Sequence, residues 1–277
     1  MMIKQIRTEN IVIKMLISDF VELSQSSYPD LSLSVFVMGS LARGGFSEAV
    51  SDIDLGLVSG KSLSNAKEEF AIIKKQLMQK YPSIKNNISI FYGSVSEINK
   101  KEGVFRYPPF DRLDLIKHAL LVSGDDIRHK LIVPQKEELL LATADFALDY
   151  LTTEVRINEF KNQELIIGKG LTYFTKTVLF PVRFIYFEKT GKISGNDVSV
   201  NYYLSRFKTA EKELVEFAFL LRTKNEISIE ALGLLKAYLI PLYLQFLEIY
   251  IPVLSRCGKP DLFHSFKKWK EKLISIE

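Results

Sequence analysis

Two aspartates separated by one residue, Asp52 and Asp54, are the side chains in this sequence best suited to do chemistry. They open an apolar run, 53–58, that is typical of a buried strand. Because side chains alternate across a strand, residues at positions i and i+2 project to the same side. Two carboxylates held side by side repel each other unless a cation lies between them. The pair therefore predicts a site for a hard cation with oxygen ligands, such as Mg²⁺ that holds a nucleotide triphosphate.

A glycine–serine pair, Gly39-Ser40, follows an earlier apolar run at about 33–38. A glycine leaves its backbone N–H group unshielded, and a serine adds a hydroxyl, so this pair at the end of a strand could reach phosphate oxygens. Arg43 lies in the connection that leads from the Gly-Ser pair to the two aspartates, and Ser51 immediately precedes Asp52. We therefore expect one loop system to contain both the phosphate contacts and the metal ligands.

Hydrophobic periodicity predicts a small α/β domain around these motifs. We expect a helix at about 10–26, strands at 33–38 and 53–58, a helix at 65–80 with Ser64 as its N-cap, and a third strand at 87–92. This order predicts a mixed sheet. Residues 94–135 form a transition, and the rest of the chain has helical patterns. Helices are expected near 137–160, 165–188, 198–222, 228–255 and 261–274.

These patterns predict the fold class as an α/β (α+β) N-terminal domain with a small mixed sheet, followed by an α-helical bundle domain. We place the first domain at 1–130 and the second at 131–277, which suits a chain of 277 residues. Hydrophobic residues make up 47% and charged residues 25%, as in well-cored globular proteins. The net charge of +4 does not favour a nucleic-acid partner, since a basic cleft for a triphosphate explains it equally well.

Several residue classes argue against other kinds of site. The one cysteine, Cys257, excludes an internal disulfide and a cysteine-based zinc site. The three histidines lack metal-ligand spacing, and we interpret them as structural. The apolar segment 237–254 is long enough to span a membrane, but Gln245, Glu248 and two prolines favour a buried helix of a bundle. The N-terminal segment 1–15 lacks the apolar run of a signal peptide, so we expect a cytoplasmic protein with no membrane partner.

The two motifs together resemble the nucleotidyltransferase superfamily, which includes DNA polymerase β, CCA-adding enzymes and antibiotic nucleotidyltransferases. Gly-Ser-x-Ala-Arg-Gly at 39–44 and Ser-Asp-Ile-Asp-Leu at 51–55 match the version found in small bacterial enzymes. The resemblance covers roughly 30–95. The layout of a small catalytic domain followed by helices further resembles the aminoglycoside and lincosamide nucleotidyltransferases.

The resemblance implies a Mg²⁺-dependent transfer in which an acceptor hydroxyl attacks the α-phosphorus of ATP, or of another nucleoside triphosphate, while pyrophosphate leaves. Asp52 and Asp54 would be the metal ligands, and Gly39 and Ser40 would hold the β- and γ-phosphates. Arg43 would be a weaker phosphate contact or, equally, a solvated loop arginine, and Ser51 belongs to the matched nucleotide-binding motif. The implied partners are the nucleotide and a small-molecule acceptor such as an aminoglycoside-like antibiotic, and a homodimer is compatible with the sequence.

The sequence departs from the family at the third carboxylate, which usually lies on the next core strand as a metal ligand or general base. Here that strand contains no acid, and Ser89 occupies the aligned position. A serine neither binds a metal strongly nor acts as a base near pH 7. Either the strand alignment is wrong, or the activity is weakened or lost, or the acid comes from elsewhere. The candidates for such an acid are Glu48, Asp111 and Asp114.

Two other activities therefore remain open at this point. One is protein AMPylation of the antitoxin type, and the other is a nucleotide-binding protein with weakened or lost catalysis. The helical half adds one further candidate feature, since Lys169, Lys176 and Arg183 recur at seven-residue spacing. These three cations could face a triphosphate or form a solvated helix face.

Overall fold

The computed structural model describes residues 6–84, 86–224 and 226–276. The chain divides into two compact units, one ending at Pro134 and the other beginning at Gln135. We describe each unit by itself. Residues 1–5, the start of the segment in which we expect no signal peptide, lie outside the described residues.

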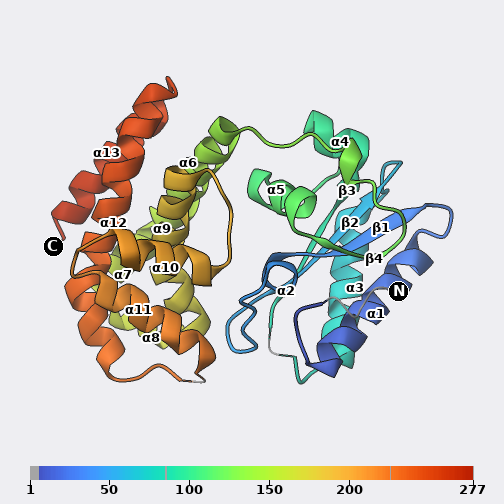
Figure 1. Cartoon of the computed structure of the whole chain (residues 1–277), viewed down its shortest axis with the longest axis horizontal. Coiled ribbons are helices and arrows are strands. Elements are labelled where there is room, and N and C mark those ends of the chain that lie inside the picture. Colours follow the sequence, from blue (N-terminus) through green and yellow to red (C-terminus); the bar gives the residue numbers. More distant parts are fainter. Residues whose placement is uncertain (1–5, 85, 225, 277) are drawn as a thin grey trace. The chain divides into compact units, whose positions relative to one another are not determined.

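A four-stranded mixed sheet forms the centre of the first unit, as the sequence predicts (Figure 1). The strand order is β3-β2-β1-β4, with β1 antiparallel to both β2 and β4 and with β2 parallel to β3. The parallel pair is joined through a helix, as such connections require. The strands are β1 (Leu33–Val37), β2 (Ile53–Ser59), β3 (Ile88–Ser94) and β4 (Leu120–Ser123).

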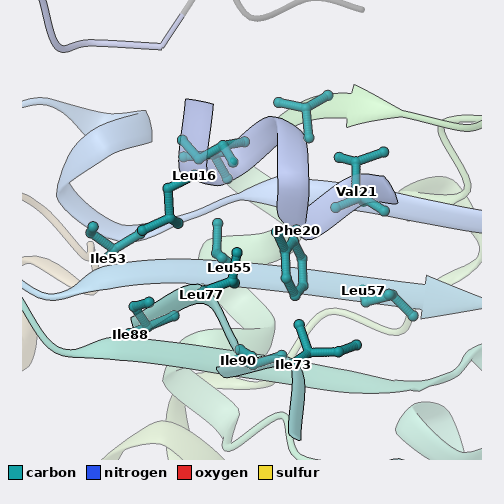
Figure 2. Packing of buried hydrophobic residues seen from close by; sticks show 14 of the residues in the cluster. Leu16, Phe20, Val21, Ile53, Leu55, Leu57, Ile73, Leu77, Ile88 and Ile90 are labelled. Carbon is teal, nitrogen blue, oxygen red and sulfur yellow. The ribbon is translucent and has the colours of Figure 1, made fainter. Parts of the chain in front are cut away.

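One face of this sheet is covered by helices α1 (Ile11–Ser27) and α3 (Ala66–Lys80). Figure 2 shows their side chains, among them Phe20 and Ile73, packed against Leu55 and its neighbours on β2 and β3. Every second residue of β2, beginning with Ile53, is fully buried in this layer. Strand alternation then places Asp54 on the opposite face.

The opposite face is covered by the short helices α4 (Val95–Lys100) and α5 (Pro109–Lys117). Its core contains Phe36, Val58 and Leu115, with α5 contributing the last of these. Helix α5 therefore lies on the same side of the sheet as Asp54. Both α5 and β4 lie within residues 94–135, for which the sequence pattern predicts no helix or strand.

The second unit is helical, as predicted, but three of the expected helices are each divided in two. Thr153 caps a new helix by accepting the N–H of Arg156, which ends the segment expected at 137–160. Gly170, at φ +87°, separates α8 from α9. The helices are α6 (Lys136–Leu151), α7 (Glu154–Lys161), α8 (Glu164–Gly168), α9 (Leu171–Thr190), α10 (Asn196–Arg206), α11 (Lys212–Leu220), α12 (Glu230–Arg256) and α13 (Pro260–Ile274).

Helix α12 contains the apolar segment that raised the question of a membrane span. Among the described residues it is the one helix long and apolar enough to cross a membrane. Half of its most apolar window is buried inside the protein. Leu239, Tyr243 and Phe246 are fully buried, and the Tyr243 hydroxyl donates a hydrogen bond to the Thr177 carbonyl of α9 (2.8 Å). These contacts are those of a core helix in a bundle.

Candidate active site

The Gly-Ser motif lies directly against the Asp-x-Asp motif. Gly39 begins the short helix α2 (Gly39–Arg43) at the end of β1, with a φ of +61° that favours glycine. A Cβ atom at this position would lie 2.1 Å from Oδ2 of Asp54. The Met38 N–H also donates to the Asp54 carbonyl (2.9 Å). The Asp54 carboxylate therefore occupies the space that a side chain at residue 39 would need, and the two predicted motifs form one site.

Negative charge is crowded around Asp54. Burial raises the pKa of Asp54 to about 7, with further contributions from the negative charges of Asp52, Asp111 and Asp114, while Arg43 acts in the opposite direction. The first of these neighbours, Asp52, lies just before β2 and is partly buried. A carboxyl group this resistant to ionisation would gain from a nearby cation. The residues present therefore fit a divalent metal ion.

Two carboxylates, one on β2 and one just before it, are a small ligand set. In the part of the chain that the structure describes, no group of three or more His, Cys, Asp or Glu residues is arranged to hold a metal ion. Mg²⁺ is commonly held by one or two carboxylates together with substrate phosphates and water. The Asp52–Asp54 pair suits that mode of binding, in which the nucleotide itself supplies the remaining ligands.

The backbone N–H of Gly39 is engaged rather than bare, and its contact with a phosphate remains a prediction. It donates to Oδ2 of Asp114 on α5 (2.8 Å). Oδ1 of the same carboxylate accepts a hydrogen bond from Nη1 of Arg43 (2.7 Å). Asp114 is 4% exposed, so this ion pair is largely withdrawn from water. Arg43 is therefore not a solvated loop arginine, and its predicted contact with phosphate remains a prediction.

Ser51 stabilises the loop that leads to the aspartates. Its hydroxyl accepts the N–H of Ser47 (2.9 Å), and its own N–H donates to the Ser47 carbonyl (2.9 Å). Nδ2 of Asn86 donates to the Ser51 carbonyl (2.6 Å). Because Ser51 is the immediate neighbour of Asp52, these bonds fix the backbone on which Asp52 lies, just before β2 begins. A direct contact between Ser51 and nucleotide remains a prediction.

The three acids proposed as a third carboxylate lie in different surroundings. Glu48 accepts a hydrogen bond from Nδ2 of Asn10 (3.1 Å) at the start of α1. Both oxygens of Asp114 are taken by Gly39 and Arg43. Asp111, in the first turn of α5, is partly exposed and close enough to contribute to the raised pKa of Asp54. Of the three, Asp111 is thus the acid best placed to act at this site.

The basic stripe expected in the helical unit is partly neutralised. Nζ of Lys169 is paired with the buried carboxylate of Glu159, which also accepts from Nη1 of Arg156 (2.6 Å) and from the hydroxyl of Tyr173 (2.7 Å). Glu159 and Arg156 are 1% and 3% exposed. This network ties α7 to α9. The sequence pattern predicts the basic spacing of Lys169 but not its pairing with Glu159. Lys169 consequently belongs to a structural ion-pair network.

Comparison with known proteins agrees with the motifs. Residues 13–106 match the family model described as a nucleotidyltransferase domain. Among solved structures, the chain is similar to the spectinomycin adenyltransferase AAD(9) from Enterococcus faecialis, a crystal structure with ATP and spectinomycin, with 14% identity, a TM-score of 0.60, and coverage of 84% of this chain and 98% of that one. A toxin–antitoxin structure with AMP-PNP matches with 15% identity and a TM-score of 0.26, over 55% of this chain and 97% of that one. No curated protein sequence matches the chain.

The second of these structural matches is too weak to inform the fold. The first shows the fold alone: an N-terminal sheet domain followed by a helical C-terminal part, as in spectinomycin adenyltransferase AAD(9). The family model spans both the Gly-Ser motif and the Asp-x-Asp motif. Residues 13–106 therefore match a nucleotidyltransferase domain, as these two motifs predict, and the fold of the chain resembles that of spectinomycin adenyltransferase AAD(9).

Proposed function

We propose that this protein is a cytoplasmic, Mg²⁺-dependent enzyme that transfers AMP from ATP to a hydroxyl group of a small molecule such as an aminoglycoside-like antibiotic. The observation that carries the proposal is the direct packing of the Asp54 carboxylate against Gly39, with Asp52 two residues away. This contact joins the metal ligands to the phosphate loop. The spectinomycin adenyltransferase of similar fold, solved with ATP and spectinomycin, supports the choice of nucleotide and of acceptor class.

In this proposal, Asp52 and Asp54 hold Mg²⁺. When bound, the ion supplies charge neutralisation for the triphosphate and lowers the pKa of the attacking hydroxyl. Ser40, which is partly exposed, donates its hydroxyl to a phosphate oxygen next to the Gly39 backbone. The Arg43 cation adds positive potential while it stays paired with Asp114. Positioning and charge neutralisation then provide most of the rate, because phosphoryl-type transfer needs little covalent chemistry from the protein.

We assign the role of general base to Asp111. Its carboxylate lies on the same side of the sheet as Asp54, and it is partly exposed, as a group must be if it is to reach an acceptor hydroxyl. Ser89 cannot perform this role near neutral pH. Asp111 would take the proton of the acceptor hydroxyl as its oxygen attacks the α-phosphorus, and pyrophosphate would leave on the opposite side.

The presence of Ser89 beside Asp54 favours one other function, namely nucleotide binding with weakened or lost transfer. Both functions are tested by incubating the purified protein with α-³²P-labelled ATP, Mg²⁺ and a panel of aminocyclitol, aminoglycoside and lincosamide acceptors. We expect a labelled small molecule and stoichiometric pyrophosphate, both absent with EDTA. Nucleotide binding without any pyrophosphate release would instead establish the binding function, and label retained on protein would indicate AMPylation. Absence of nucleotide binding would overturn the proposal.

A further inference from the structure

We propose that Asp114 is a positioning residue for this reaction. Ser40 lies in the turn α2, and the Asp114 carboxylate binds this turn to helix α5, which covers the site. The inference rests on the proposed function and extends it to a residue outside the family motif. Asp114 lies on α5. It is 75 residues further along the chain than Gly39, whose N–H it binds. Its hydrogen bonds act on the site through the Gly39 backbone and through Arg43.

Both oxygens of the carboxylate are used for this purpose. Oδ2 accepts the Gly39 N–H at 2.8 Å, and Oδ1 accepts from Nη1 of Arg43 at 2.7 Å. These two partners are the first and last residues of α2. One buried side chain therefore holds both ends of the five-residue turn. Charge-assisted bonds of this kind are among the strongest that a backbone amide and a guanidinium make.

The Gly39 residue is consequently held between two carboxylates. Asp114 binds its N–H group. Asp54 occupies the space beside its Cα, where an added Cβ atom would lie 2.1 Å from Oδ2 of Asp54. Its left-handed backbone, with φ at +61°, sets the direction in which the next residue leaves. Because Ser40 is that residue, rotation of the Gly39 peptide would move the Ser40 hydroxyl relative to the Asp54 carboxylate. Asp114 is the contact that prevents this rotation.

The ion pair with Asp114 also determines the position of the Arg43 guanidinium. Arg43 already influences the ionisation of Asp54, so the two groups are electrostatically coupled. Nε of Arg43 is buried and has no hydrogen-bond partner among the described residues, and the Nη1 bond to Asp114 directs the guanidinium. If the charge on Asp114 is removed, the guanidinium is left to compete with Mg²⁺ for Asp54. Asp114 therefore keeps Arg43 away from the metal ligands.

The test compares binding and turnover in the full-length protein and three variants. Asp114→Asn keeps an oxygen for the Gly39 N–H but removes the charge that holds Arg43. We expect it to weaken binding of Mg²⁺ with AMP-PNP, measured without an acceptor so that no transfer occurs, by about tenfold or more. We also expect it to lower kcat by roughly 10²-fold, the loss typical of a small misplacement of reacting groups. The double variant Arg43→Gln, Asp114→Asn removes the competing cation, so it should recover Mg²⁺ affinity but not full kcat.

Arg112→Met is the matched control, since Arg112 lies on the same helix, is 2% exposed, and donates from Nη1 to the Ile98 carbonyl of α4 (3.2 Å). It should lower the melting temperature without changing Mg²⁺–AMP-PNP affinity measured below the transition. If Asp114→Asn binds like the parent, or loses no more than Arg112→Met does, the positioning role is overturned while the proposed function stands. If the parent itself fails to bind AMP-PNP with Mg²⁺, the proposed function and this inference both fall.

Discussion

Asp54 and Ser89 are direct partners across the parallel strands β2 and β3. Paired residues of neighbouring strands project to the same face, so Ser89 stands beside the proposed metal ligand as the strand alignment required. Replacing Ser89 by Asp should therefore add a third carboxylate to the site. Without metal, we expect a lower melting temperature from charge repulsion, and with Mg²⁺ we expect tighter metal binding.

The Ser89→Asp experiment consists of thermal denaturation with EDTA and with Mg²⁺, together with a Mg²⁺ titration. Ser89→Asn is the matched neutral variant and should show neither effect. If the Asp variant matched the parent in both melting temperature and Mg²⁺ affinity, residue 89 would lie away from the metal.

Asp52→Ala and Asp54→Ala should each abolish Mg²⁺-dependent transfer and leave the fold intact, because each removes one of the two carboxylates proposed to hold the ion. Pyrophosphate release and circular dichroism measure the two properties separately. Asp30→Ala, at an exposed position of the same unit, is the control and should retain activity. Near-normal turnover in both active-site variants would contradict the metal assignment.

The raised pKa of Asp54, about 7, predicts a pH-dependent stability of the metal-free protein. Well below pH 3.8, the ordinary pKa of an aspartate, the group is protonated in both states. As the pH rises, the unfolded chain ionises first, so the folded state loses stability between pH 3.8 and about 7, and the loss then levels off. Asp54→Asn removes this loss and should be more stable than the parent by roughly 1–3 kcal/mol at pH 8 but not at pH 4. Urea denaturation in EDTA at both pH values measures the difference, and equal differences at the two values would contradict it.

Gly39→Ala should disrupt the site severely. The new methyl group would collide with Oδ2 of Asp54, and the positive φ would add strain of about 1–3 kcal/mol. Gly233→Ala is the matched control, because no heavy atom lies within 4 Å of its added methyl group and it occupies a helix interior. The control should be neutral or stabilised by about 0.5–1 kcal/mol. Chemical denaturation and ATP binding compare the pair, and a fully functional Gly39→Ala variant would exclude the observed packing.

Asp111→Asn should lower kcat by about 10²–10⁴-fold, the usual contribution of a general base, and should leave AMP-PNP affinity nearly unchanged. Steady-state kinetics with the best acceptor, together with a binding titration, separate the two quantities. Glu48→Gln serves as the comparison, since Glu48 bonds to Asn10 at the start of α1. Equal rates for the two variants would remove Asp111 from the mechanism.

The parts of the fold that were predictable depend on local patterns. The apolar strands, the Gly-Ser turn and the aspartate pair are contiguous in the sequence, and the register of β1 with β2 brings them together. Helix boundaries were less predictable where a single residue decides them. Ser64 was expected to cap α3, but Asn65 takes this position in a left-handed conformation, with φ at +53°, and α3 begins at Ala66.

The parts that were missed depend on contacts between distant residues. Strand β4 has four residues and pairs with β1 across a register shift, which gives little local periodicity. The bond between Asp114 and the Gly39 amide has no sequence signature, because nothing near residue 114 indicates which buried donor its carboxylate will meet. Likewise, the spacing of Lys169 gave no sign of its buried partner Glu159.

The span of the Asp114–Gly39 bond also bears on how far the catalytic module extends. The segment that matches the family ends at residue 106, before both α5 and β4. A fragment excised at that point would retain every motif residue, yet it would expose one edge of β1 and leave the Gly39 amide without its acceptor. During synthesis, likewise, the loop cannot reach its final geometry until α5 has left the ribosome. The compact unit that holds the site therefore extends past the boundary of the recognisable motifs, through β4 and Leu131 of its core, to Pro134.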